Sequence, residues 1–229
     1  MKPLLISLTS NIPGVGHYIG SLKNLGDSVE PLMVTFAPEV PLSTEYRTIK
    51  APVTYPGNLS RFKYFPFDEI ADDQMVVFTD TSDVIFQCPL PELEMDKIYV
   101  CPENALFDDH SWWKNFFERT GYHGLDGKPI FNMGCWAMSG AKAKELIGFV
   151  NDSGAMFGFD EYSDQPLFNL WLQNQVCEVH PTLMTCLFDN LSTNNVSKSK
   201  KGFVNQKDEL YSIVHANGGT ELKELLVSK

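Results

Sequence analysis

Short apolar runs recur along the chain, separated by polar stretches that contain proline and glycine. Several of these runs are continuous rather than alternating, which is typical of strands covered on both faces. We predict strands at residues 4–8, 32–36, 75–79, 98–101, 134–138, 176–179 and 211–214. Other segments space their apolar residues three or four apart, as helices do. We predict helices at residues 17–25, 59–70, 112–119, 141–150 and 166–175.

The breaks between these segments support this order of elements. Gly26 is expected to end the first helix, Pro66 interrupts the second, and Ser163 is placed to cap the last. Residues 38–56, which are rich in proline and polar side chains, predict a loop, and the basic stretch 198–201 predicts an exposed loop. Because strands alternate with helices, we expect an α/β sandwich that forms one domain over residues 1–229.

Composition narrows the class of protein. The 229 residues are 43% hydrophobic and 21% charged, as in ordinary globular proteins, and no apolar run approaches the ~18–20 residues that span a bilayer. The charge balance, 18 basic against 29 acidic residues, gives −11 and disfavours nonspecific binding to nucleic acid or anionic lipid. Five cysteines without CxxC spacing favour free thiols, and the N-terminal run is too short for a signal peptide, so we expect a cytoplasmic protein.

Two carboxylates stand directly after the clearest strand. Asp80 follows the run 75–79, and Asp83 comes three residues later. Ligands of α/β sheets bind at the carboxyl ends of strands, and a hard divalent cation takes carboxylate oxygens together with substrate phosphates. The pair therefore predicts a cation site, with two solvated loop acids as the alternative.

Three further segments carry candidate side chains. His215 follows the run 213–214 and offers a third ligand, and the turn that follows it contains glycine, which lets a backbone approach a phosphate closely. Asn132 and Gly134 lie at the mouth of an apolar stretch that is otherwise expected to form core. Asp164 and Gln165 open the last helix, where helix capping and dipole matching are the alternative roles.

Together these segments resemble a family. Residues 76–86 are similar to the FxDxxDV segment of GT-A glycosyltransferases, and most closely to that of the glycosyltransferase domains of procollagen lysyl hydroxylases. The other motifs follow in the family's order: an asparagine, a small residue and glycine; an aspartate–glutamine pair that opens a helix; and histidine–x–asparagine–glycine. They are Asn132-Met133-Gly134, Ser163-Asp164-Gln165 and His215-Ala216-Asn217-Gly218.

The resemblance implies a GT-A fold, which is a Rossmann-like α/β/α sandwich with a central mixed, mostly parallel sheet. It also implies that Asp80, Asp83 and His215 hold Mn²⁺ (or Mg²⁺), which in turn holds the diphosphate of a UDP-sugar. Asp164 and Gln165 would face the sugar or the acceptor. The remaining donor-binding residues that it implies are Thr9, Ser10, Asn11, Lys63, Thr81, Ser82, Asn132, Gly134, Asn217 and Gly218. Arg61 competes with Lys63 for the contact with the phosphates.

The activity expected from this resemblance is metal-dependent transfer of a sugar from a UDP-sugar to a hydroxyl acceptor, with retention of configuration. The acceptor class stays open between a saccharide, a protein, a metabolite and modified nucleic acid. If the enzyme inverted instead, Asp164, Asp160 or Glu161 would supply the base. One alternative is a metal-dependent nucleotidyltransferase, which Gly14-Val15-Gly16 disfavours because no Arg or Lys stands nearby. The other is a non-catalytic module that binds a nucleotide sugar or a carbohydrate.

Overall fold

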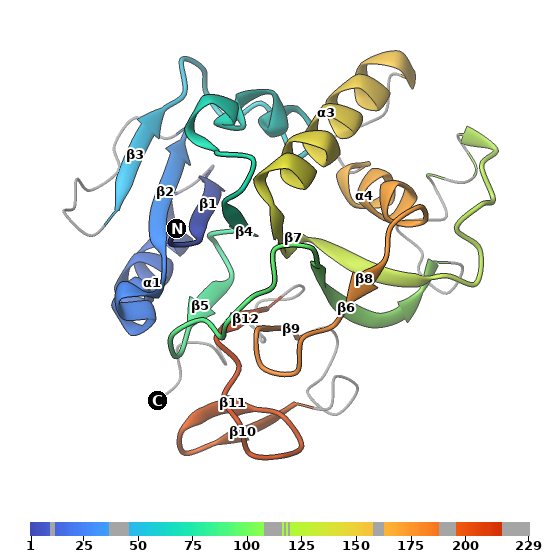
Figure 1. The fold of residues 1–229 in the computed structure, drawn as a ribbon. Helices are drawn as coiled ribbons and strands as arrows, with labels where there is room; N and C mark the ends of the chain where they lie inside the picture. The colour runs from blue at the N-terminus through green and yellow to red at the C-terminus, as the bar shows by residue number, and fades with distance from the viewer. Residues whose placement is uncertain are drawn as a thin grey trace.

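The fold is built on one seven-stranded sheet (Figure 1). The structure is a computed structural model that describes residues 1–9, 12–36, 46–107, 116, 118, 120–157, 163–187 and 196–216. The strands of this sheet, in spatial order, are β3 (Arg47–Lys50), β2 (Glu30–Thr35), β1 (Leu4–Thr9), β4 (Met75–Thr79), β7 (Pro129–Ser139), β6 (Ile98–Leu106) and β8 (Cys177–Glu178). Only β7 runs against its neighbours, so the sheet is mixed and mostly parallel, as predicted.

Both faces of this sheet are covered, which explains the continuous apolar runs of its strands. In β1, Leu4, Ile6 and Leu8 belong to one core, and Leu5 belongs to the other. The first core packs under α3 (Gly140–Phe157) and α4 (Asp164–Leu172). The second packs under α1 (Ile12–Leu22) and a small three-stranded sheet, whose order is β5 (Val84–Phe86), β12 (Ile213–His215) and β9 (Met184–Cys186). The outer layer on this second face is therefore part helix and part sheet (Figure 1).

Short elements complete the described fold. They are the 3-10 helices η1 (Lys23–Ser28), η2 (Ser60–Tyr64) and η3 (Phe67–Glu69), and the antiparallel pair β10 (Ser197–Ser199) and β11 (Gly202–Val204). All five cysteines are free thiols, and three of them are buried. Among the described residues, no helix is both long enough and apolar enough to span a bilayer.

Each predicted strand has a counterpart, although β6, β7 and α3 extend several residues beyond the predicted ends. The first helix, α1, begins before the predicted residue 17 and ends at Leu22, and Gly26 does not end it but lies inside η1 with a φ of 55°. The predicted helix 59–70 is wrong, because Pro66 lies between η2 and η3. The loop 38–56 contains the edge strand β3, and the basic stretch 198–201 belongs to the β10–β11 hairpin. Ser163 does not cap α4 with its side chain; its carbonyl oxygen accepts a hydrogen bond from the Leu167 N–H. Most of the predicted helix 112–119 lies outside the described residues.

Candidate metal centre

Three strands bring together the two acids and the histidine that the sequence singled out. Asp80 directly follows β4, Asp83 directly precedes β5, and His215 ends β12. β12 pairs antiparallel with β5 so that His215 lies opposite Val84, and the Ala216 N–H donates to the Asp83 carbonyl oxygen over 2.8 Å. The small sheet on the second face therefore places His215 beside the carboxyl end of β4.

The three side chains form one compact group. His215 Nε2 lies 3.2 Å from Asp83 Oδ1 and 4.0 Å from Asp80 Oδ2, and one ligand atom from each residue lies within 4.8 Å of the others. Burial, the largest single influence, lowers the pKa of His215, but Asp83 and Cys186 together raise it, so the pKa is well above the ordinary histidine value. Asp83 and Cys186 therefore favour the positively charged form of the imidazole.

The donor set fits a divalent cation. Two carboxylates supply oxygen ligands and an imidazole supplies nitrogen, a combination that proteins use for divalent metals. His215 is 1% exposed, and apart from the ionic contact of Nε2 with Asp83 its ring nitrogens have no hydrogen-bond partner among the described residues. Buried polar atoms are usually paired, and Nε2, which faces both acids, has only this ionic contact. A cation among the three side chains would be a further partner for Nε2.

Gly134 on β7 makes room for this group. Its carbonyl oxygen accepts the Asp80 N–H over 2.8 Å, which fixes Asp80 against β7. A Cβ at position 134 would come within 2.8 Å of Asp80 Cγ and 2.9 Å of His215 Cε1, closer than real Cβ atoms come to their neighbours. The glycine predicted as a ligand contact is thus also required by the packing of the acid and the histidine.

Arg61 is the basic residue that contacts the acids. It lies on η2, is 7% exposed, and places Nη1 2.8 Å from Asp80 Oδ1 and Nη2 3.6 Å from Asp164 Oδ2. Its guanidinium also lies over the ring of Phe62, 5.0 Å from the centroid. Lys63, the other basic candidate, is exposed on the same turn. Of the two, Arg61 is therefore the residue that contacts the acidic group, and which of them contacts the phosphates stays a prediction.

Asp164 has an unusual environment for a carboxyl group. Burial raises its pKa, the Arg61 charge lowers it and the Asp80 charge raises it, with the result that the pKa is about 6. An ordinary aspartate has a pKa near ~3.9. Asp164 therefore titrates close to neutrality, beside the group that could hold a cation.

A buried acid that the sequence analysis missed, Glu103, accepts hydrogen bonds from two of the predicted site residues. Glu103 on β6 is 2% exposed, and its Oε1 accepts hydrogen bonds from Asn132 Nδ2 (2.6 Å) and Gln165 Nε2 (3.1 Å). Gln165 Oε1 in turn accepts the Met133 N–H over 3.2 Å. Glu103 thus brings together Asn132 and Gln165, which the sequence analysis named as separate candidates. The available signal for Glu103 was an acid just after a predicted buried strand, the same pattern that identified Asp80.

The other predicted residues are placed as follows. Thr81 Oγ1 donates to Thr9 Oγ1 over 3.1 Å, and both side chains are buried. Ser82 is exposed between the two acids. The candidates that lie outside the described residues are Ser10, Asn11, Asp160, Glu161, Asn217 and Gly218.

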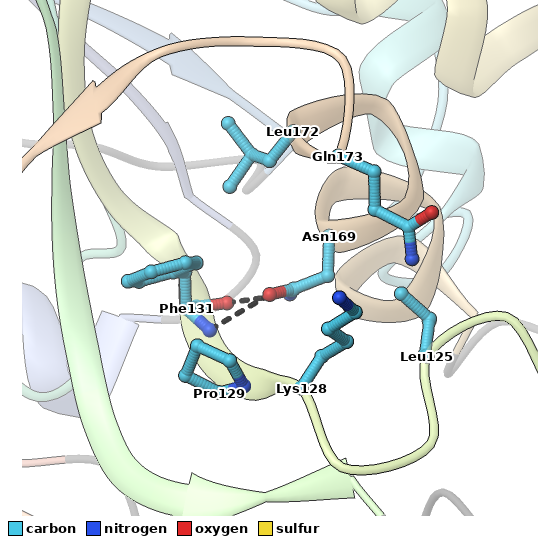
Figure 2. Close-up of a pocket in the computed structure, with 7 residues that line it drawn as sticks. All are labelled: Leu125, Lys128, Pro129, Phe131, Asn169, Leu172 and Gln173. Atoms are coloured by element: carbon cyan, nitrogen blue, oxygen red, sulfur yellow. Dashed lines mark hydrogen bonds between the residues drawn. The ribbon is translucent and has the colours of Figure 1, made fainter.

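A cavity of about 230 Å³ lies between the end of α4 and the start of β7, and Figure 2 shows its lining. Asn169 points from α4 to Phe131, donating to its carbonyl oxygen over 2.7 Å and accepting from its N–H over 2.8 Å. None of the three candidate metal ligands lines this cavity. Asn169, one of its polar lining residues, is therefore occupied with holding α4 against β7.

Comparison with known protein families finds none whose model matches the chain, and comparison with characterised proteins finds no match. The assignment of a function therefore rests on the residues and their geometry.

Proposed function

We propose that the protein is a divalent-metal-dependent glycosyltransferase of the GT-A type, which transfers a sugar from a UDP-sugar to a hydroxyl acceptor. The observation that carries the proposal is the Asp80–Asp83–His215 group, because two acids and a buried histidine converge where α/β sheets bind ligands. The order of motifs along the chain, which resembles that of GT-A glycosyltransferases, is the reason for proposing a UDP-sugar as the donor.

Electrostatics explains why a cation belongs in this mechanism. At ~4 Å, two like charges repel by about 4 kcal/mol at an effective dielectric constant near ~20, so bare carboxylates would repel a diphosphate. A bound divalent cation supplies Lewis-acid stabilisation of charge on the departing diphosphate. Asp80, Asp83 and His215 are the side chains that would hold it. Arg61 places a buried positive charge against Asp80, where it balances one of the acids.

We assign Asp164 and Gln165 to the sugar and acceptor side of the site. Both are buried at the amino end of α4, and Asp164 is joined to the metal-candidate acids through Arg61. With a pKa of about 6, Asp164 is largely ionised at neutral pH and can accept a hydrogen bond from a hydroxyl group. Retention of configuration is the outcome that we expect, and proton NMR of the anomeric centre of fresh product measures it.

The proposal is tested by release of UDP from a panel of UDP-sugars in the presence of Mn²⁺. We expect EDTA to abolish release, and Asp80→Asn and Asp83→Asn each to lower turnover by about a thousandfold, the loss typical when electrostatic stabilisation of the leaving group is removed. Asp72→Asn is the control, because Asp72 is exposed and pairs with Lys144 on the surface. Turnover that is unaffected by EDTA and by both substitutions would refute the metal assignment.

The same assay separates the alternatives. A nucleotidyltransferase joins a nucleotide to a sugar phosphate and releases pyrophosphate, whereas a glycosyltransferase releases UDP. A binding module would bind UDP-sugars with Mn²⁺ and release neither product, whatever acceptor is added.

A further inference from the structure

Glu103 is a buried carboxylate that accepts hydrogen bonds from two side-chain amides. Two different side chains, Asn132 and Gln165, donate to the same oxygen of Glu103. Burying a carboxylate is costly unless hydrogen bonds or a cation compensate it, so these two bonds are part of what keeps the acid in place. Glu103 therefore forms the centre of a small polar network between β6, β7 and α4.

The carboxylate fixes the orientation of both amides. An ionised carboxylate only accepts hydrogen bonds, so each amide must turn its NH₂ group towards Glu103 and its carbonyl oxygen away. For Gln165 the outward oxygen is used, because it accepts the Met133 N–H. For Asn132 the outward Oδ1 is buried and has no hydrogen-bond partner among the described residues. That oxygen is an acceptor held in a fixed direction.

This acceptor belongs to the same set of contacts as the candidate metal centre. Asn132 lies two residues before Gly134, whose carbonyl oxygen holds the Asp80 N–H. On the other side, Gln165 follows Asp164, and Arg61 joins Asp164 to Asp80. The contacts run from the cation-binding acids through both sides to Glu103, so they form a closed ring of side chains and backbone.

We propose that Glu103 is a positioning residue that presents Asn132 Oδ1 to a hydroxyl group of the donor sugar. An acceptor atom needs a ligand that brings an O–H or N–H, and the hydroxyls of a sugar do so. A diphosphate at neutral pH brings acceptors and does not fit this position, whereas a ribose hydroxyl of the nucleotide would, and the Kd for UDP tests that alternative. The inference rests on the proposed function and adds to it a residue that selects the sugar rather than the nucleotide.

Calorimetry in the presence of Mn²⁺ tests this division. The probes are UDP and whichever of UDP-glucose, UDP-galactose and UDP-N-acetylglucosamine wild type binds best. Glu103→Met and Asn132→Ala should each leave the Kd for UDP unchanged and raise the Kd for the UDP-sugar about tenfold, the loss of roughly one hydrogen bond. The double variant should lose no more than either single variant, because both act through one atom. Glu145→Gln on α3 is the control and should change neither Kd.

Glu103→Gln keeps an acceptor oxygen for the two amides. Its Kd for the UDP-sugar should stay within about threefold of the wild-type value, a change worth a fraction of one hydrogen bond. If Glu103→Met does not fold, Glu103→Gln takes its place in the comparison of single and double variants. If Glu103→Met raises the Kd for UDP and the Kd for the UDP-sugar equally, the positioning role is overturned while the proposed function stands. The same holds if the double variant raises the Kd for the UDP-sugar about a hundredfold. If wild type with Mn²⁺ binds neither UDP nor any of the UDP-sugars, the proposed function fails, and the inference fails with it.

Discussion

The two sides of the candidate site are built in opposite ways. The ionic side consists of Arg61, Asp80, Asp83 and His215, and the amide side consists of Glu103, Asn132, Gln165 and Asn169. On the ionic side, charges lie close together, and the His215 ring and Arg61 Nε retain buried nitrogens without hydrogen bonds in the described chain. On the amide side, almost every polar atom is bonded to a neighbour across β6, β7 and α4.

The difference indicates a division of labour. A satisfied hydrogen-bond network holds one geometry, so the amide side acts as a fixed frame. Close charges with unpaired atoms are stabilised further by a ligand of the right charge, so the ionic side gains most from a cation and an anionic donor. Arg61 and Asp164 connect the two sides, and changes at these residues test the comparison most directly.

The largest expected effect on stability comes from Arg61→Met. Removing one partner of a buried ion pair typically costs ~3–5 kcal/mol, because the remaining charges keep no counter-ion. Arg47→Met is the matched control: Arg47 also contacts two acids, at 3.1 and 2.9 Å, but it is half exposed, and such pairs contribute ~0–1 kcal/mol. Urea unfolding of both variants measures the difference, and equal losses would contradict a buried linking role for Arg61.

A smaller, pH-dependent effect is expected at Asp164. Its pKa is about 6 in the folded protein and near ~3.9 when unfolded, so the folded state binds the proton more tightly. This contribution favours folding below pH ~4 and is lost as the pH rises through ~4–6. Relative to Asp164→Asn, wild type should therefore lose up to ~3 kcal/mol of unfolding free energy between pH 4 and pH 7 in EDTA.

Urea unfolding of the two proteins at several pH values gives this difference directly. A difference that stays constant from pH 4 to pH 7, or one that grows in favour of wild type as the pH rises, would show that Asp164 is not held with a raised pKa.

The smallest effect on stability is expected at Gly134. A methyl group there must displace Asp80 or His215, and overpacking of this kind costs ~1–3 kcal/mol. Gly148→Ala in α3 is the control: a Cβ at that position meets nothing within 4 Å, and alanine in a helix is favoured over glycine by ~0.5–1 kcal/mol. Mn²⁺ binding should weaken in Gly134→Ala and stay unchanged in Gly148→Ala. Unaltered Mn²⁺ binding in both would separate Gly134 from the metal site.

The sequence was informative where one segment carries its own pattern. The run before Asp80 is apolar on both faces, so the strand and the acid at its end are recognisable without knowledge of any partner. The strand before His215 was predicted over residues 211–214, and the structure places it at Ile213–His215. The strands β3, β5 and β9 have only three or four residues each, and they form because a neighbouring strand pairs with them, which no local pattern reports.

Long-range contacts account for the rest. Glu103 acquires its role from residues 29 and 62 positions away along the chain. The choice between Arg61 and Lys63 depends on which side of one 3-10 turn faces β4, and two basic residues two positions apart do not reveal it. Patterns of apolar residues predict elements, whereas the pairing of polar side chains across elements follows from the fold.

The position of β12 between β5 and β9 has a consequence for how the protein is made. During synthesis Asp80 and Asp83 leave the ribosome well before His215, and the strand that carries His215 is the one that joins β5 to β9 in the small sheet. The candidate metal site is therefore incomplete until this strand is in place, and a nascent chain that lacks the strand holds only two of the three proposed ligands.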